Sequence, residues 1–180
     1  MSFAGERDFL KGNFFSPDGT NSTGLKTLQD IETIVPNFRQ ITTEKLLRHG
    51  LTQEESAAFF LDPLETHPKS QSAYFLKGRI GNSEILGAAT TEDTYSSEHY
   101  HPEGLGERYC VIGGNVIVVM EGQDFPLAAG DVMDIPPNTY HHVYTEKDAY
   151  GLLLIHMEDA LLFPAERRHL GRREAQRRAR

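Results

Sequence analysis

The sequence predicts a mostly β protein, folded as an antiparallel sandwich or barrel, on three observations. From about residue 72 the chain breaks into short runs rich in β-branched and aromatic residues. Gly, Asn, Asp or Pro separates each run from the next, as turn residues separate strands. No helical pattern interrupts the series, which argues against parallel βαβ units. Seven runs share these features: SAYFLKGRI, SEILGAATT, ERYCVIGG, NVIVVMEG, DVMDIP, HHVYTE and YGLLLIH.

The length and composition favour one domain without a membrane partner. A chain of 180 residues is long enough to bury a substantial core. Its longest apolar runs, such as residues 152–155, are far too short to cross a bilayer. The first ten residues carry charge and lack an apolar signal core, and Cys110 is a single cysteine that cannot form an internal disulfide. We therefore expect a cytoplasmic protein.

The charge is unevenly distributed along the chain. The formal net charge is -8, yet residues 166–180 hold seven arginines against two glutamates, a local balance of +5 that leaves -13 for the rest. A basic tail can attract nucleic acid, but a solvated terminal helix is the simpler interpretation. Because the body is acidic, we do not expect nucleic acid to be the main partner.

The segment before the predicted strands differs from them in composition and in its predicted secondary structure. Residues 1–24 are rich in Gly, Ser, Asn and Pro and predict an arm with little regular structure. Residues 42–61 predict two short helices, the second beginning at the Thr52-x-x-Glu55 capping box. Pro63 and Pro68 are expected to end this helical part.

Three parts of one structural domain follow from these patterns. Residues 1–71 form the arm and short helices, residues 72–157 the β-barrel, and residues 158–180 a helical basic tail. Gly113-Gly114-Asn115 lies between two apolar runs and predicts a tight hairpin turn. The arm and an exposed sheet edge predict a homodimer.

The stretch SEHYHPEGLGERYCVIGG contains the residues best suited to chemistry. Side chains two apart on a strand face the same way, so His99 and His101 project together, and so do Glu107 and Tyr109. If these faces and that of His141 line a closed barrel, three imidazoles and a carboxylate meet. Such donors suit a divalent transition metal.

At these residues the sequence resembles the cupin superfamily. Its first motif is matched by His99-x-His101, followed after five residues by Glu107 and then by Gly114. Its second motif is matched by Gly130, Pro136, Asn138 and His141. The resemblance covers about residues 72–156 and implies an antiparallel cupin barrel of the double-stranded β-helix, jelly-roll type. It also implies that His99, His101, Glu107 and His141 bind one metal ion per subunit.

The motifs depart from the family pattern at three places. The gap before Glu107 is one residue longer than the commonest form, Asn138 replaces a glycine, and Thr145 replaces an asparagine. None of these changes removes a ligand. The longer loop leaves open a three-histidine site in which Glu107 acts as an acid or base.

Further residues are candidates for roles in the same site. Tyr109 shares the face of Glu107, so it can bind a substrate oxygen or move a proton, although core packing is an equal alternative. Arg79 can pair with an anionic substrate, although an exposed arginine is the commoner case, and His156 can line the pocket, although a satisfied, partly buried histidine is the commoner alternative. Cys110 and His142 alternate away from the ligands and are expected on the opposite strand faces.

The expected function is catalysis on a small organic substrate that chelates the metal. A dioxygenase is the leading hypothesis, with Fe(II) favoured and Mn, Ni, Co, Cu or Zn as other candidate ions. A non-oxidative lyase, isomerase, cyclase or decarboxylase at the same site is the second hypothesis. A non-catalytic small-molecule-binding protein is the third, because one fold hosts many functions.

Overall fold

Strands dominate the computed structural model, which describes residues 23–66, 72–92, 96, 98–101, 106–157 and 168–170. The mostly antiparallel β class predicted from the sequence is confirmed. The helices of the described residues are α2 (Leu28–Ile34), α3 (Phe38–Leu47) and α4 (Gln53–Ala57). The strands are β1 (Phe60–Thr66), β2 (Ala73–Ile80), β3 (Ser83–Thr91), β4 (Glu107–Met120), β5 (Gln123–Ala128), β6 (Asp131–Ile135), β7 (His141–Tyr144), β8 (Tyr150–Met157) and β9 (Arg168–Leu170).

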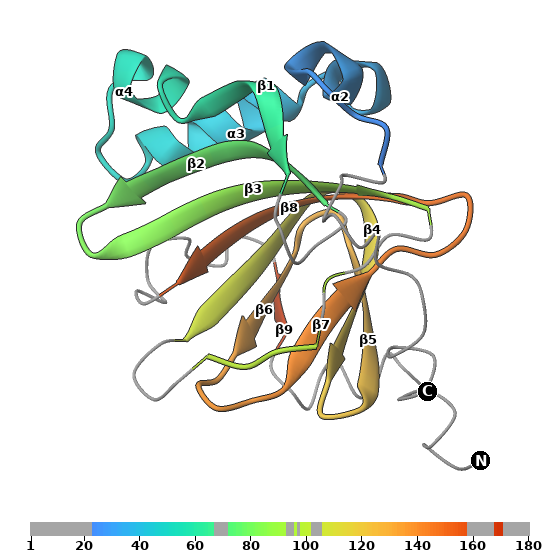
Figure 1. Ribbon diagram of the computed structural model, residues 1–180. Coiled ribbons are helices and arrows are strands. Elements are labelled where there is room, and N and C mark those ends of the chain that lie inside the picture. Colours follow the sequence, from blue (N-terminus) through green and yellow to red (C-terminus); the bar gives the residue numbers. More distant parts are fainter. Residues whose placement is uncertain are drawn as a thin grey trace.

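A long curved sheet and a smaller one share strand β4. The long sheet runs β1-β2-β3-β8-β4-β6-β9, whereas β5 and β7 pair with the second half of β4. Figure 1 shows β2, β3 and β8 as a layer beneath the helices, with β5 and β7 below it. Two sheets that face each other through a shared strand form the barrel.

The bend in β4 replaces the hairpin turn expected at Gly113-Gly114-Asn115. That prediction was wrong, because β4 continues through these residues and exchanges its partners β6 and β8 for β5 and β7. Gly114 has φ +68°, and a Cβ there would lie 2.0 Å from the carbonyl oxygen of Tyr150. The glycine does change the direction of the chain, but it does so by a bend within one strand and not by a turn between two strands.

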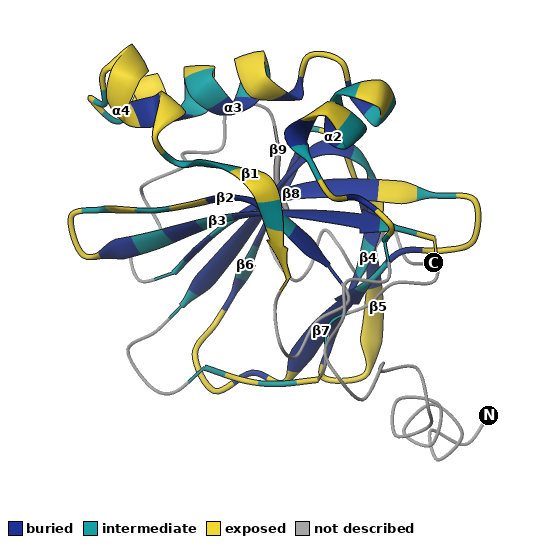
Figure 2. Ribbon diagram, turned by 45° about the horizontal axis from the view of Figure 1, so that its top comes forward, coloured by how far each residue is buried: buried dark blue, intermediate teal, exposed yellow. Residues whose placement is uncertain are grey.

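Two apolar cores lie on opposite faces of the long sheet. The inner core fills the barrel and includes Tyr109, Phe125 and Leu153. The outer core lies between the sheet and the helices and includes Phe38, Phe75 and Cys110. Figure 2 shows the buried sheet residues between the exposed faces of the helices and the lower strands. Cys110 therefore packs on the outer face, as expected.

The N-terminal helices differ in part from the prediction. The capping box at Thr52 is present and begins α4, but α3 begins at Phe38 and α2 was not predicted. Residues 60–61 belong to β1 rather than to a helix. Pro63 lies inside β1, which tolerates a proline because, among the described strands, β1 is at the edge of the sheet and pairs with β2 alone.

The C-terminal part contains a strand where a helix was expected. Arg168–Leu170 form β9, whose backbone pairs in parallel with β6. Within the described residues, β6 pairs with β4 on one edge, and β9 pairs with its other backbone edge, which would otherwise be left open. The remainder of the expected tail and the expected arm at residues 1–22 lie outside the described residues.

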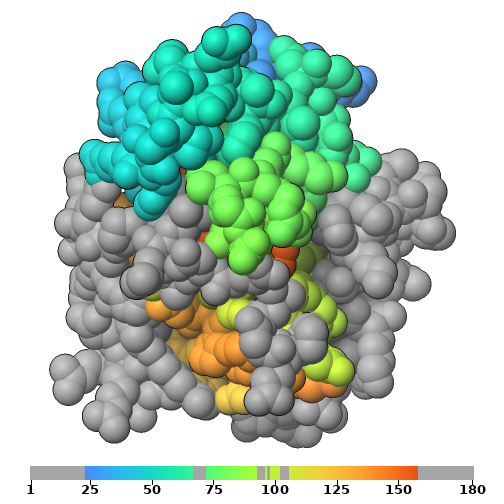
Figure 3. Space-filling model, turned by 90° about the vertical axis from the view of Figure 1, so that its left-hand side faces the viewer, coloured from blue at the N-terminus to red at the C-terminus, as the bar shows by residue number. Residues whose placement is uncertain are grey.

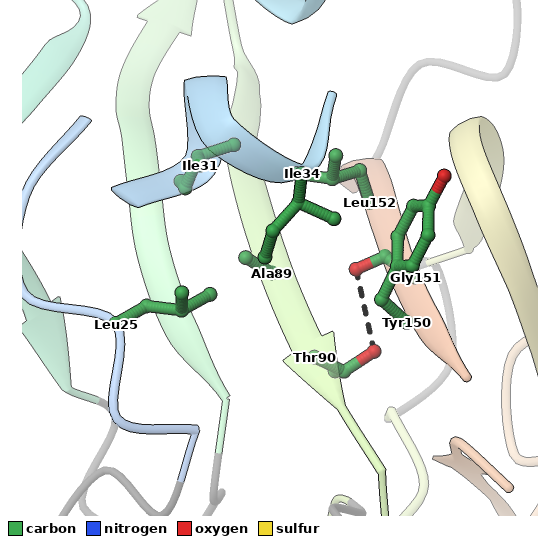
Figure 4. Close-up of a pocket in the computed structure, with 8 residues that line it drawn as sticks. All are labelled: Leu25, Ile31, Ile34, Ala89, Thr90, Tyr150, Gly151 and Leu152. Carbon is green, nitrogen blue, oxygen red and sulfur yellow. Dashed lines mark hydrogen bonds between the residues drawn. The ribbon is translucent and has the colours of Figure 1, made fainter. Parts of the chain in front are cut away.

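A crevice lies between α2 and the ends of β3 and β8. Its lining includes Ile31, Ala89, Thr90 and Leu152, and it has no room for a water molecule (Figure 4). We interpret it as a packing gap rather than a binding site. No helix among the described residues is long and apolar enough to span a bilayer.

Candidate metal centre

Backbone pairing places His99 and His101 beside His141. His99 and His141 form an antiparallel bridge in which each backbone N–H donates to the other residue's carbonyl, at 3.0 and 2.8 Å. On either side of the bridge, the amide of Ser96 donates to the carbonyl of Val143 and that of Asn138 to the carbonyl of His101. Residues paired in this way have side chains on one face, so the imidazoles of His99 and His141 project together.

Glu107 enters the same space from the first residue of β4. It is paired with Ile135 on one side and Met157 on the other, and its side chain is 6% exposed. Tyr109, two residues further on, lies in the inner core, which identifies the face of Glu107 as the barrel interior.

The four predicted ligands converge on one point. His99, His101, Glu107 and His141 each offer a donor atom, and these four atoms lie within 4.8 Å of one another. Glu107 Oε2 is 2.7 Å from His141 Nε2 and 3.2 Å from His101 Nε2. The ring centroids of His99 and His141 are 4.4 Å apart. Side chains from three separate segments therefore surround a single position.

The contacts of His141 require a proton or a metal ion between this ring and Glu107. Its Nδ1 is 2.8 Å from the carbonyl oxygen of Thr139, which can only accept, so Nδ1 carries a proton. In a neutral imidazole, Nε2 then presents a lone pair to the carboxylate oxygen of Glu107. Lone pairs 2.7 Å apart repel, so either a second proton or a metal ion must lie between them.

The environment keeps Glu107 ionised. Burial by itself raises the pKa of this carboxyl, but hydrogen bonds from His101 and His141 outweigh burial and lower the pKa to about 2. The same contact with Glu107 raises the pKa of His101, although burial opposes that change. A buried carboxylate held in its charged form by imidazoles is a site prepared for a cation.

The donor set fits a divalent transition metal. Three imidazole nitrogens and one carboxylate oxygen suit borderline ions, and the Thr139 carbonyl fixes the tautomer of His141 as outer partners do in metal proteins. The half-buried state of His99 and His101, against complete burial of His141, places the accessible side of the cluster at residues 98–101.

Tyr109 lies next to the cluster and remains protonated. Its ring centroid is 6.1 Å from that of His141. Burial, the charge of Glu107 and a hydrogen bond to Glu107 raise the pKa of its phenol well above the usual value. A neutral phenol whose oxygen faces a carboxylate donates a hydrogen bond to that carboxylate. Tyr109 is therefore packed in the inner core beside Glu107, and its binding of a substrate oxygen stays a prediction.

Two other predicted residues are not brought to the cluster. His156 is paired with Arg108 and Ile85, on the outer face of the sheet, while its neighbour Ile155 faces the interior. Of the two alternatives for His156, pocket lining is not supported, because strand alternation turns the side chain towards the helices, where it is a buried histidine with 1% exposure. Arg79 is exposed, and two strands, β3 and β8, separate its strand from β4.

Tyr74 and Glu84 face the barrel interior, and the sequence analysis did not identify them. Tyr74 is paired with Ala88, which is paired with Leu153 of the inner core. A bulge between Tyr74 and Leu76 shifts the alternation of β2, so counting by twos does not reveal this face. Glu84 is the first charged residue of β3, and its orientation towards the interior follows only from its pairing with Met157.

The family comparison covers the strands that carry the ligands. Residues 89–158 match the family model described as a cupin domain. This segment contains His99, His101, Glu107 and His141 and strands β4 to β8. No curated protein matches the chain significantly.

Solved structures with a similar fold include proteins from three bacteria. A Cupin 2 conserved barrel domain protein from Salinispora arenicola is 21% identical, with 52% of this chain and 80% of that chain covered and a TM-score of 0.44. A sugar phosphate isomerase of the cupin superfamily from Silicibacter pomeroyi is 17% identical, with 49% and 60% covered and a TM-score of 0.44. KdgF from Halomonas sp. is 16% identical, with 57% and 94% covered and a TM-score of 0.46.

These similarities are too distant to transfer a substrate or a reaction. The family match and the convergence of its four motif residues in a β-barrel carry the assignment instead. Residues 89–158 of the chain therefore match a cupin domain.

Proposed function

We propose that the protein is a metal-dependent enzyme that acts on a small organic substrate, with His99, His101, Glu107 and His141 holding one divalent ion. The observation that carries this proposal is the convergence of the four donor atoms within 4.8 Å around an ionised, buried carboxylate. Fe(II) is the favoured ion, and Mn, Ni, Co, Cu and Zn are accepted by the same donors.

When bound, the ion supplies a Lewis acid with open coordination positions and, if redox-active, electrons for dioxygen. The residues of the chain supply the surroundings. Tyr109 holds Glu107 by a hydrogen bond, and the Thr139 carbonyl holds His141 in one tautomer. Ile135, paired with Glu107, and Met133, paired with Tyr109, are buried apolar residues beside these side chains and exclude bulk water from this side.

The leading reaction is oxidative cleavage by dioxygen, as in a dioxygenase. Four protein donors leave room on a six-coordinate ion for a chelating substrate and dioxygen side by side. The accessible face of the cluster, on the side of His99 and His101, is where both would enter. This proposal predicts that turnover consumes oxygen in proportion to substrate.

A non-oxidative lyase or isomerase is the second candidate, and Tyr109 is the observation that favours it. Its raised pKa keeps the phenol protonated at neutral pH, so Tyr109 can donate a hydrogen bond to a substrate oxygen. Glu107, with a pKa of about 2, is ionised at neutral pH and serves as a ligand rather than as an acid.

The deciding experiment is a substrate screen on metal-loaded protein with an oxygen electrode. A dioxygenase stops under strict anaerobiosis, and equal turnover without oxygen would overturn it in favour of the second candidate. The His101→Ala variant tests catalysis itself, with His49→Ala as the matched control outside the cluster. If no substrate turns over in protein that binds its ion and a small molecule, the non-catalytic binding protein replaces both enzymes.

A further inference from the structure

Tyr100 and Tyr140 form an aromatic pair behind the metal ligands. The bridge between His99 and His141 is a hydrogen-bonded pair of an antiparallel ladder, since each backbone N–H donates to the other residue's carbonyl. The next pair along such a ladder is not hydrogen-bonded, and its side chains approach more closely. Tyr100 and Tyr140 occupy this position, and their ring centroids are 5.0 Å apart with the ring planes inclined at 61°.

Both rings of this pair are accessible to solvent. Tyr100 is 50% exposed and Tyr140 is 52% exposed, whereas His141 is completely buried. Strand alternation explains the contrast, because the ligands on either side of Tyr100 face the cluster and the tyrosine between them faces outwards. In the space-filling view, yellow-green atoms from around residue 100 lie beside orange atoms from around residue 140, below the green β2–β3 hairpin (Figure 3). The pair is therefore open to small reagents in solution.

Two phenol rings in contact can be joined by oxidation. Each phenol first loses its hydroxyl hydrogen, as a proton and an electron, and the unpaired electron is shared with the ring carbons beside the oxygen. A carbon–carbon bond then forms between one Cε atom of each ring, and the hydrogen on each of these carbons moves to the phenol oxygen. The product is dityrosine, which has lost two hydrogens. One molecule of hydrogen peroxide takes up the two protons and two electrons and becomes two molecules of water.

The pair lies next to the ligands in sequence as well as in space. Tyr100 stands between His99 and His101, and Tyr140 directly precedes His141. A redox-active ion, when bound, supplies the one-electron chemistry that starts the coupling with peroxide. This source of oxidising power rests on the proposed function, whereas the contact between the two rings does not.

We propose that Tyr100 and Tyr140 are a site of oxidative modification, at which peroxide joins the two rings into an intramolecular dityrosine. The new bond ties the segment that carries His99 and His101 to the strand that begins at His141. These three ligands then stay side by side even without an ion. Closing the loop between residues 100 and 140 also restricts the unfolded chain, as a disulfide does, and stabilises the fold.

The test treats the dilute, Fe(II)-loaded full chain with hydrogen peroxide. We expect dityrosine fluorescence, loss of two hydrogens from a chain that stays monomeric in mass, and a covalent link between the tryptic peptides 80–108 and 109–147. Tyr100→Phe and Tyr140→Phe should each lose this product, because a phenylalanine ring has no hydroxyl hydrogen to give up. Tyr144→Phe, on the outer face of β7, is the matched control and should retain it. The cross-linked chain should unfold at a higher urea concentration than the untreated chain.

Two further samples separate the pair from the metal centre. Zinc-loaded protein has the same ligands and a redox-inert ion, so it should not form the cross-link. Metal-free protein treated with a haem peroxidase and peroxide should form it. A cross-link with the peroxidase but none with Fe(II), or equal yields with zinc and Fe(II), would overturn only the role of the ion. Hydroxylated tyrosines without a cross-link, chains joined to one another instead, or a product that survives Tyr100→Phe would overturn the site itself.

Discussion

The imidazole Nε2 of His141 lies 2.7 Å from the carboxylate Oε2 of Glu107, and both side chains are at most 6% exposed. Nδ1 of the same ring donates to the Thr139 carbonyl, so a second proton or a metal ion must lie between the two facing atoms. This pair is the inner half of the ligand cluster, and His99 and His101 complete it from the accessible side.

Loss of a ligand should remove the ion. We expect His141→Ala and His101→Ala to weaken binding by at least about 100-fold, because outer partners of metal ligands alone account for 10- to 100-fold. Elemental analysis after equilibrium dialysis measures the ion retained per chain. His49→Ala is the control, and equal metal content in all three variants would contradict the assignment.

Tyr109→Phe should weaken the ion's binding while leaving the fold intact. The variant keeps the ring in the inner core but removes the phenol that hydrogen-bonds to Glu107. We expect a loss of affinity of about 10-fold, in the range for outer partners of metal ligands. Competition with a chromophoric chelator measures the affinity. An unchanged affinity would show that Tyr109 is only a packing residue.

The bend of β4 depends on Gly114. Gly114→Ala combines a strained positive φ with a Cβ only 2.0 Å from the Tyr150 carbonyl oxygen, and should cost at least about 3 kcal/mol of stability. Gly81→Ala is the matched control: its φ of +59° is similar, but nothing lies within 4 Å of the added Cβ. We expect about 1 kcal/mol there. Urea unfolding measures both, and equal losses would refute the steric argument.

His142 should make stability depend on pH. Burial lowers its pKa to about 4, against an opposing effect of Asp124, and the side chain is neutral in the folded state. The unfolded chain has the ordinary value of about 6.5 and binds more protons between pH 6.5 and pH 4. Stability is therefore complete above about pH 6.5 and falls as the pH drops to about 4, by at most about 3 kcal/mol.

The His142→Gln variant isolates this effect. Urea unfolding of metal-free protein at several pH values gives the free energy of unfolding for both chains, without a contribution from metal release. The difference between the variant and the parent should change between pH 6.5 and pH 4, in favour of the variant at low pH. Parallel curves would contradict the role of His142.

The sequence predicted the ligands well because their positions follow from short-range rules. His99 and His101 are two residues apart on an extended segment, and alternation alone puts them on one face. The motif spacings then related this segment to Glu107 and His141. His142 was rightly placed on the opposite face, but its burial was not foreseen, since alternation does not reveal what lies against that face.

The incorrect predictions concern positions where the backbone departs from regular geometry, or where the partner strand determines which face of the sheet a side chain occupies. The bulge after Tyr74 and the bend at Gly114 each change the pairing without a local signal that distinguishes them from a turn. His156 could be placed only once Arg108 was known to lie opposite it. The homodimer, the cytoplasmic location, the minor role of nucleic acid and the small-molecule substrate stay predictions.

The most direct test of the central claim is X-ray absorption spectroscopy of the protein loaded with Co(II). Multiple scattering from imidazole rings reports how many histidines are bound to the ion. Convergence of His99, His101 and His141 with Glu107 predicts three imidazoles and a carboxylate oxygen in the parent chain, and two imidazoles in any histidine variant that still retains cobalt. A spectrum of oxygen ligands alone, or one unaffected by His101→Ala, would contradict the account.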